Sequence, residues 1–262
     1  MNRLKILVTG CGGDIGQSIG KILLESFKEA ELYGIDISDK NAAKFIFPNF
    51  QKAPKVTEEG YIDFIKNFVR NNAIDVVIPI AEPELREYSL HGWDFDTIGA
   101  KVITANHNAL AVGFDKMATV NFLEKNGFTY PVTRVVSNNC DYPVLPVVFK
   151  SRTGSGSKSV VVAEDIKSFE FFKEKYETED FIIQEFIPAE EGEFTCGLFR
   201  SRGGEIRSIV FRRELTGGYS GYGEIVESDA ITSLLKNIAI SLDLRGSINV
   251  QLRLKDGNPY IF

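Results

Sequence analysis

Apolar stretches of strand length alternate with amphipathic stretches of helix length through the first 110 residues. The strand-length stretches are residues 4–10, 31–38, 73–81 and 101–105. Residues 14–29 and 61–72 lie between them, and their apolar side chains recur with a period of about 3.6, which is typical of helices. The run AIDVVIPIA (73–81) is apolar at almost every position, which indicates a strand covered on both faces. This alternation predicts a doubly wound, Rossmann-like α/β domain with a parallel sheet over residues 1–110.

The rest of the chain has a different pattern, in which longer strand-like runs are separated by glycine-rich turns. Strands are expected within residues 146–164, 180–187, 193–215 and 246–262, and helices over residues 165–177 and 231–244. Asp165 is the expected cap of the first of these helices, and the final hairpin is expected to turn at Asp256 and Gly257. The glycine-rich stretch 214–228 is expected to be a loop. We therefore predict an α+β region with antiparallel sheets over residues 111–262, packed against the first domain.

The composition excludes several classes of partner. The chain has a net charge of -6 and no block of lysine or arginine, so nothing favours nucleic acid or an acidic membrane surface. No apolar run approaches the roughly 18 residues that a membrane helix needs, and no secretory leader is expected. The three cysteines form no C-x-x-C pair and the chain has only two histidines, which argues against zinc chemistry. We expect a soluble, cytoplasmic protein.

The loop LVTGCGGDIG (7–16) is a first candidate for ligand binding. Gly10, Gly13 and Gly16 form G-x-x-G-x-x-G between a strand and a helix, and Asp36 ends the next strand. A dinucleotide-binding fold uses such parts for a pyrophosphate and a ribose. Short-chain epimerases and reductases also carry a Tyr-x-x-x-Lys pair, but none of the nine tyrosines here has a lysine four positions later. We therefore interpret the loop chiefly as architecture and keep an NAD(P)-dependent epimerase or reductase as an alternative function.

A second glycine-rich segment, FKSRTGSGSKSVVV (149–162), is the stronger candidate for phosphate binding. Lys150 ends an apolar strand, and successive backbone N–H groups in the turn that follows can face phosphate oxygens. The segment is not a Walker loop, because Lys158 follows a serine and precedes a strand. Upstream, the stretch DKMATVNFLEKNGF places Lys116 at the start of a helix.

The series DK, VVFK, GSGSKS, IIQEFI, GEFT and INVQ, in this order and spacing, resembles the ATP-grasp superfamily, especially its branch similar to the large subunit of carbamoyl-phosphate synthase. The resemblance covers nearly the whole chain. It implies that residues 1–110 are a Rossmann-like pre-ATP-grasp domain and that residues 111–262 are an ATP-grasp domain. The two lobes of that domain would span about 111–187 and 188–262.

The resemblance, carried over by position, implies a site for ATP. Lys116 and Lys150 would contact the phosphates, and Glu193 would accept hydrogen bonds from the ribose hydroxyls. The flap over the phosphates would consist of Gly154, Ser155, Gly156 and Ser157. The segment that holds adenine would consist of Gln184, Glu185, Phe186 and Ile187, whose backbone groups pair with the polar edge of the base.

The resemblance further implies an ATP- and Mg²⁺-dependent ligase that converts a carboxylate to an acyl phosphate, which an amine or another nucleophile then attacks. Gln251 would supply one oxygen ligand to magnesium. Arg213, beside Arg212, is the candidate catalytic residue that faces the phosphates or an acidic substrate. The partners would be small-molecule carboxylates and amines, and a homodimer is compatible with the resemblance.

The resemblance ends at Phe262, before the E-x-N-P-R-like run that usually follows in this family. Because that run carries the principal carboxylate ligand of the metal, we expect the chain as given to bind nucleotide but to be catalytically impaired. A non-catalytic nucleotide-binding protein is therefore a second alternative.

Overall fold

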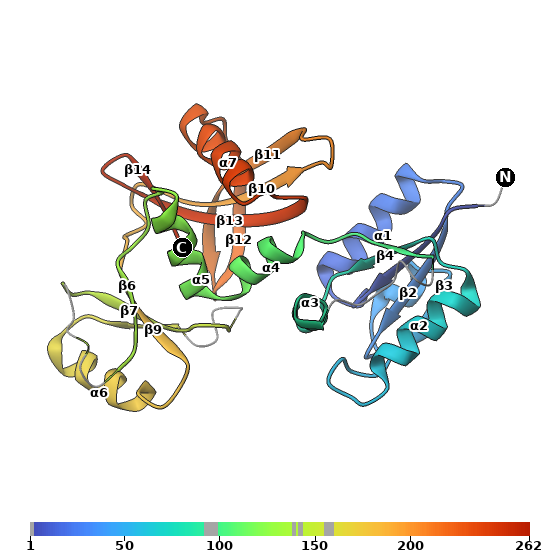
Figure 1. The fold of residues 1–262 in the computed structure, drawn as a ribbon, viewed down its shortest axis with the longest axis horizontal. Helices are drawn as coiled ribbons and strands as arrows, with labels where there is room; N and C mark the ends of the chain where they lie inside the picture. The colour runs from blue at the N-terminus through green and yellow to red at the C-terminus, as the bar shows by residue number, and fades with distance from the viewer. Residues whose placement is uncertain (1–2, 92–98, 138–139, 141–143, 155–159) are drawn as a thin grey trace. The chain divides into compact units, whose positions relative to one another are not determined.

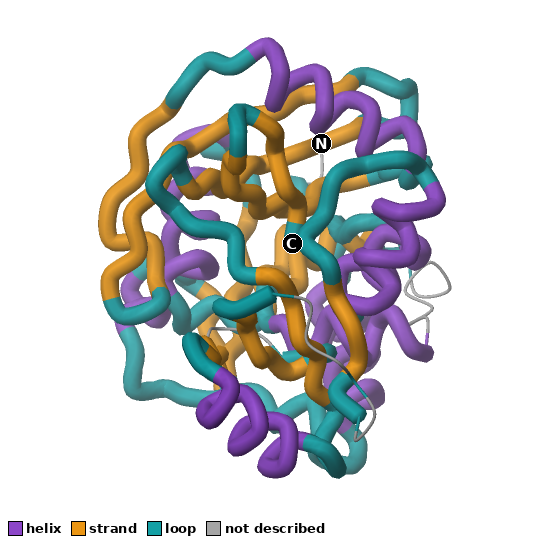
Figure 2. The backbone as a smooth tube through the Cα atoms, turned by 90° about the vertical axis from the view of Figure 1, so that its left-hand side faces the viewer, coloured by secondary structure: helices purple, strands orange, loops and turns teal. Residues whose placement is uncertain are grey.

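The computed structural model describes the whole chain except residues 1–2, 92–98, 138–139, 141–143 and 155–159. The chain divides into two compact units, Met1–Thr104 and Ala105–Phe262. Each unit combines strands with helices, as the labels of Figure 1 show. Figure 2 draws the helices of the chain in purple and its strands in orange. In the part of the chain that the structure describes, no helix is both long enough and apolar enough to span a membrane.

The first unit contains a parallel sheet with strand order β3-β2-β1-β4-β5. Its strands are β1 (Lys5–Thr9), β2 (Glu31–Asp36), β3 (Asn49–Lys52), β4 (Val76–Pro79) and β5 (Lys101–Val102). Its helices are α1 (Asp14–Ser26), α2 (Tyr61–Asn72), α3 (Glu82–His91) and the short 3-10 helix η1 (Ala42–Phe45). Ile6 of β1 shares a core cluster with Leu23 of α1, whereas Leu7 shares another with Ile65 of α2. Because neighbouring strand residues point to opposite faces, helices cover both sides of the sheet, which confirms the predicted fold class.

Three features of this unit differ from the prediction. The sheet has five strands and not the four that were predicted. The short edge strand β3 was not predicted because it is polar and three of its four residues are exposed. The strand expected over residues 101–105 contains only Lys101 and Val102. Helix α3 was not predicted, although its first turn carries two acidic residues, which favour a helix N-terminus.

The second unit begins with helices α4 (His107–Phe114) and α5 (Lys116–Lys125) and then forms a four-stranded antiparallel sheet of order β6-β9-β7-β8. The strands are β6 (Thr133–Val135), β7 (Val147–Ser151), β8 (Val160–Ala163) and β9 (Phe181–Glu185). Helix α6 (Ile166–Tyr176) covers one face, where Phe149 and Phe169 are fully buried. As predicted, Asp165 caps α6, and its Oδ1 accepts the Ser168 N–H at 2.7 Å. The opposite face of this sheet lines the pocket described in the next section.

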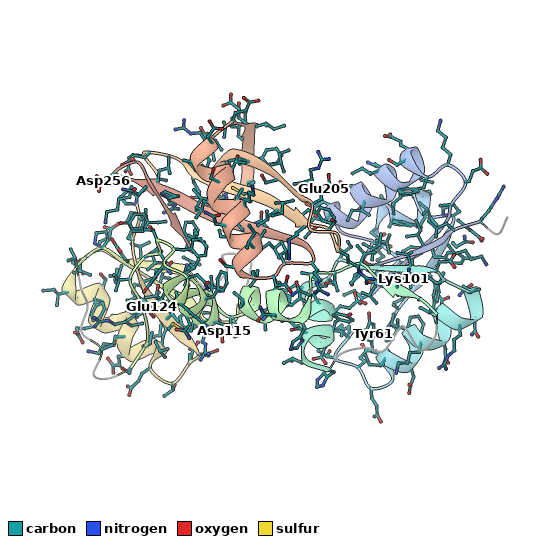
Figure 3. All side chains as sticks on the ribbon, turned by 45° about the horizontal axis from the view of Figure 1, so that its top comes forward. Tyr61, Lys101, Asp115, Glu124, Glu205 and Asp256 are labelled. Atoms are coloured by element: carbon teal, nitrogen blue, oxygen red, sulfur yellow. The ribbon has the colours of Figure 1, made fainter. Side chains whose placement is uncertain are left out.

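A five-stranded antiparallel sheet of order β12-β11-β10-β13-β14 completes the second unit. Its strands are β10 (Glu193–Arg200), β11 (Ile206–Thr216), β12 (Tyr219–Ile225), β13 (Gly246–Lys255) and β14 (Asn258–Ile261), and its helix is α7 (Asp229–Ser241). The predicted turn between β13 and β14 is confirmed: Asp256 and Gly257 have φ of 53° and 70° (Figure 3). Such positive φ values are typical of a two-residue hairpin turn.

The prediction of a loop over residues 214–228 was wrong. Residues 219–225 form β12, which pairs with β11 through a second tight turn at Gly217 and Gly218. Both glycines have positive φ, 60° and 84°. A glycine-glycine pair between two strands is a hairpin signal, and the further glycines of β12 concealed it in the sequence.

Candidate functional site

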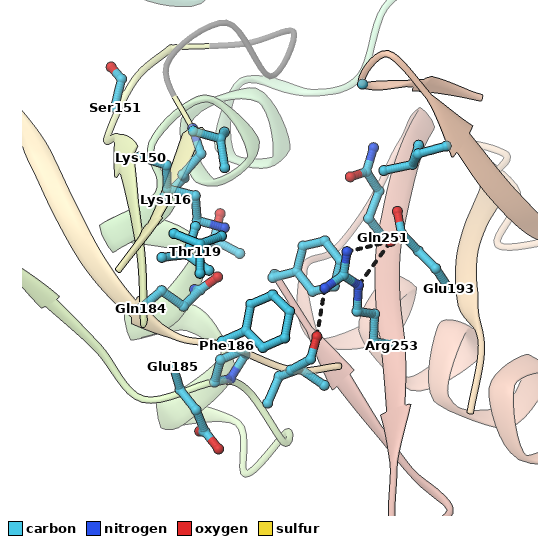
Figure 4. Close-up of a pocket in the computed structure, with 18 of the residues that line it drawn as sticks. Lys116, Thr119, Lys150, Ser151, Gln184, Glu185, Phe186, Glu193, Gln251 and Arg253 are labelled. Atoms are coloured by element: carbon cyan, nitrogen blue, oxygen red, sulfur yellow. Dashed lines mark hydrogen bonds and ion pairs between the residues drawn. The ribbon is translucent and has the colours of Figure 1, made fainter. Parts of the chain in front are cut away.

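A pocket of about 510 Å³ lies in the second unit, between elements of its two sheets and helix α5 (Figure 4). It brings together ten of the residues that the sequence nominated. These are Lys116, Lys150, Gly154, Gln184, Glu185, Phe186, Ile187, Glu193, Arg213 and Gln251. The nominated Ser155, Gly156 and Ser157 lie outside the described residues. Segments from both sheets of the second unit and from helix α5 thus meet at one cavity. The role of each residue is still a prediction.

Lys150 reaches the pocket because of strand alternation in β7. Phe149 points into the core and is fully buried, so Lys150 points to the opposite face, where it lines the cavity. It has no acidic partner among the described residues, and its Nζ lies 5.3 Å from the centroid of the Phe262 ring. Burial, together with the positive charges of Lys116 and Arg253, lowers the pKa of Lys150 to about 7. Within the described part of the chain, Lys150 thus lies near two positive charges and pairs with no carboxylate, which disfavours its ammonium form.

Lys116 is placed by the cap of helix α5. The Oδ1 atom of Asp115 accepts the backbone N–H groups of Met117 and Ala118, at 2.8 and 3.3 Å. The same carboxylate forms a bidentate pair with Arg152, just after β7, with distances of 2.8 and 2.6 Å. These bonds with Arg152 hold the pKa of Asp115 below its usual range. The ammonium of Lys116 donates to the carbonyl oxygen of Gly154 at 2.7 Å, so the start of the helix is linked to the start of the glycine-rich turn.

The residues at the end of strand β9 line the pocket, and two of their polar side chains bind other residues of the protein. Gln184 is buried, and its amide donates to the Thr133 hydroxyl at 2.8 Å. The carboxylate of Glu185 pairs with Lys255 at 2.7 Å. In contrast, the N–H of Ile187, a residue only 3% exposed, donates to no group in the described part of the chain. A buried N–H without a partner at a cavity wall fits an acceptor atom of a ligand.

A row of three charged residues lies on the pocket-facing side of the five-stranded antiparallel sheet. Strand register places Glu193 directly opposite Arg213 on one side and opposite Arg253 on the other. One carboxylate oxygen of Glu193 accepts from Arg213 at 3.0 and 2.8 Å, and the other accepts from Arg253 at 2.9 and 2.6 Å. The carboxylate of Glu193 is thus buried, held in one orientation and surrounded by an excess of positive charge.

Of the two neighbouring arginines on β11, one lines the pocket. Arg213 shares its face of the sheet with Glu193, whereas Arg212 is exposed and is not part of the cavity wall. Successive strand residues point to opposite faces, so the paired arginines cannot both reach one ligand on this sheet.

Gln251 is the only nominated metal ligand, and its side-chain amide makes no hydrogen bond with the described residues. It lies on the same face of β13 as Arg253, which the sequence did not nominate. The signal for Arg253 was available, since a residue two positions beyond Gln251 on a strand must share its face. Within the described ranges, no group of three or more acidic, histidine or cysteine side chains is arranged to hold a metal ion.

The glycine-rich loop of the first unit is held together by its own side chains. Asp36, the acid that a dinucleotide fold would turn to a ribose, accepts the Gly12 N–H at 2.7 Å and the Ser38 N–H at 3.0 Å. A β-carbon on Gly16 would lie 2.6 Å from Cα of Cys11, so glycine is required there for packing. These contacts account for the loop as architecture.

A smaller cavity of about 390 Å³ in the first unit is lined by Gly10 of this loop and by the buried Glu84. Glu84 is 2% exposed and accepts hydrogen bonds from the hydroxyls of Thr9 and Tyr61, the latter at 2.6 Å. Burial raises the pKa of Glu84 above its ordinary value despite these bonds.

The Glu84→Gln variant is expected to melt a few degrees above the wild type at pH 7. Because the pKa of Glu84 is higher in the folded state, ionisation opposes folding once the pH rises above the unfolded-state value, and glutamine avoids that cost. The gain should shrink towards zero as the pH is lowered through 5 to 4, which thermal unfolding at several pH values would measure. Glu82→Gln, which changes a partly exposed carboxylate of the same helix turn, is the matched control. A gain in melting temperature that does not depend on pH would contradict the conclusion that burial raises the pKa of Glu84.

Two family models match the chain. The model described as ATP-grasp domain matches residues 114–262, and the model described as PylC-like, N-terminal domain matches residues 6–103. The comparison with curated proteins gives no match.

Several solved structures have the same fold. One is the ADP complex of an N5-carboxyaminoimidazole ribonucleotide synthetase, with 18% identity and a TM-score of 0.78 over all of this chain and 71% of that one. Another is an L-amino acid ligase from Bacillus licheniformis, with 16% identity and a TM-score of 0.71 over all of this chain and 66% of that one. A third is the biotin carboxylase domain of the 2-oxoglutarate carboxylase from Hydrogenobacter thermophilus, with MgADP and bicarbonate. It has 12% identity and a TM-score of 0.77 over all of this chain and 63% of that one.

Proposed function

Because the chain belongs to the ATP-grasp family, we propose that it binds ATP in the pocket of its second unit and acts as an ATP-dependent ligase. The reaction would activate a carboxylate as an acyl phosphate for attack by an amine or another nucleophile. The observation that carries this proposal is the convergence of Lys116 and Lys150 on the pocket that also contains the end of β9 and the carboxylate of Glu193. This arrangement offers separate chemistry for phosphates, base and ribose.

The pocket residues would act by charge neutralisation and positioning. Lys116 and Lys150 would bind the phosphate oxygens, while a carboxylate oxygen of the substrate attacks the γ-phosphorus and ADP leaves. The amine would then attack the carbonyl carbon of the acyl phosphate, inorganic phosphate would leave, and the amine would lose a proton. Arg213 would contribute positive charge at the floor of the pocket, where its pairing with Glu193 keeps it in place.

A resident magnesium site is not complete among the described residues. Gln251 offers one neutral amide oxygen, and Glu193, an acidic residue that lines the same pocket, is paired with two arginines. Mg²⁺ in nucleotide sites is commonly held by one or two protein oxygens together with phosphate oxygens and water. We therefore propose Gln251 as one ligand of an ion that would arrive with the nucleotide.

The partners proposed for the chain are a small-molecule carboxylate and an amine. The similar solved structures are named as a synthetase, an amino acid ligase and a carboxylase domain that forms a dimer, which supports small substrates and makes a homodimer of this chain a reasonable proposal. The three cysteines are free and buried, which supports a reducing, cytoplasmic setting.

Equilibrium binding of ATP, ADP and NADH tests the proposal. Titration calorimetry should give micromolar binding of ATP and ADP and no binding of NADH. Binding of NADH without binding of adenosine phosphates would support the NAD(P)-dependent alternative instead. Substrate-dependent release of ADP across panels of carboxylates and amines then separates a ligase from a non-catalytic nucleotide-binding protein.

ATP affinity is expected to fall as the pH rises from 7 to 9, by up to about tenfold per pH unit. The pKa of Lys150 is lowered to about 7, so the ammonium loses its proton over this range. A bound triphosphate favours the charged form, and binding therefore takes up a proton. Calorimetry in buffers of different ionisation enthalpy measures that uptake. Lys150→Met should abolish the uptake, and an unchanged uptake in this variant would assign it to another group.

A further inference from the structure

Arg253 connects two parts of the pocket that are far apart in the sequence. Its Nη1 atom donates to the carbonyl oxygen of Ile187 at 2.6 Å. Its Nε and Nη2 atoms donate to the Oε2 atom of Glu193 at 2.9 and 2.6 Å. Figure 4 shows these bonds as dashed lines, with the guanidinium between the end of the segment 184–187 and the carboxylate. One planar group thus contacts both the residue proposed for the base and the residue proposed for the ribose.

The second arginine on Glu193 provides a contrast. Arg213 donates to the Oε1 atom of Glu193 and lies 3.3 Å from the hydroxyl of Ser220, and none of these bonds reaches the segment 184–187. Both arginines are mostly buried, with 11% and 21% of the side chain exposed for Arg213 and Arg253. The two side chains therefore have the same charge and the same carboxylate partner, but only Arg253 has the bond to Ile187.

We propose that Arg253 is a positioning residue that couples recognition of the base to recognition of the ribose. The guanidinium is a rigid plane with donors at fixed angles, so bonds to Ile187 and Glu193 fix the distance between the two acceptors. The Ile187 N–H, which has no partner in the described part of the chain, then keeps its aim at a ring nitrogen of the base. This inference rests on the proposed function, because it assigns a role within the ATP site.

The position of Arg253 in the strand explains how it reaches both partners. Leu252 and Val250 point to the buried side of β13, so Gln251 and Arg253 project to the pocket side. The guanidinium carbon also lies 5.9 Å and 5.7 Å from the ring centroids of Phe186 and Phe262, which limits its freedom to rotate away. A purely structural role would be visible as a general loss of affinity, whereas a positioning role changes which nucleotides are preferred.

The test measures the dissociation constants of three nucleotides with the full chain. ATP is compared with 2′-deoxy-ATP, which lacks a ribose hydroxyl, and with 1-deaza-ATP, which lacks the ring acceptor for the Ile187 N–H. The wild type is expected to prefer ATP over each analogue by about tenfold, the effect of one lost hydrogen bond to a buried or charged partner. Arg253→Met should reduce both preferences to nearly one. Arg213→Met, the matched control, should weaken the ribose preference and leave the base preference near its wild-type value.

Arg253→Lys separates geometry from charge and remains informative if the methionine variant does not fold. An ammonium keeps the positive charge but has no rigid fork, so the lysine variant is expected to retain neither preference in full. Full rescue by lysine, or equal loss of affinity for all three nucleotides in both variants with the preferences unchanged, would overturn the inference. If the wild type itself bound no ATP, the proposed function would fail first, and the two failures would be distinguishable.

Discussion

Replacing Lys150 by alanine is expected to weaken ATP binding at least tenfold and to leave the melting temperature at or slightly above that of the wild type. The side chain has no acidic partner among the described residues, so its removal breaks no ion pair there. It also removes repulsion from Lys116 and Arg253, the positive charges that help to lower the pKa of Lys150. The ligand loses a charge-assisted contact, which contributes roughly 1.5–3 kcal/mol.

Titration calorimetry and thermal unfolding of the same preparation measure both halves of this expectation. Lys236→Ala is the matched control, because it removes the same charge from an exposed position on α7. The control should change neither quantity. An ATP affinity that is equal in the wild type and in Lys150→Ala would refute the assignment of the phosphate site.

Replacing Glu193 by alanine is expected to lower the free energy of unfolding by about 3–5 kcal/mol, since it leaves two largely buried guanidinium groups without their carboxylate. Glu193→Gln should cost less, because the amide oxygen still accepts the two hydrogen bonds from one of the arginines and no cavity forms. Chemical denaturation measures both values. The loss in the alanine variant is larger than that for most single substitutions because both arginines lose the same partner.

An exposed ion pair in the same sheet serves as the control for Glu193. The Oε1 atom of Glu205 and the Nη2 atom of Arg207 lie 2.6 Å apart near the turn between β10 and β11. The side chains of Glu205 and Arg207 are 62% and 76% exposed. Glu205→Ala should change the free energy of unfolding by less than about 1 kcal/mol. Equal losses at the two positions would indicate that burial of the Glu193 row has little influence on its strength.

Much of the fold could be predicted because local patterns and the final structure agree. The cap at Asp165, the turn at Asp256 and the alternation of apolar and amphipathic stretches each act over a few residues, so they are visible in the sequence. The edge strand β3 was missed because an edge needs no apolar side chains, and β12 was missed because its glycines resemble a loop.

The candidate site could be predicted as a set of residues but not as a network. Motif order nominated ten residues that line the pocket, yet nothing local indicates that Arg253 stands opposite Glu193, sixty positions earlier. That pairing depends on the register of β10 and β13, which is set by packing across the whole sheet. For the same reason the resemblance assigned Glu193 to the ribose without indicating its two arginine partners.

The carboxylate of Asp115 bonds both to the first turn of α5 and to Arg152, just beyond β7. These bonds connect the segment that carries Lys116 to the segment that carries Lys150, and they form without a ligand. Folding has then met the entropic and repulsive cost of bringing like charges near each other, and a polyanion encounters a receptor that needs little rearrangement. If the two lysines bind phosphates as proposed, this prior arrangement would favour fast association of the nucleotide and little rearrangement when it dissociates.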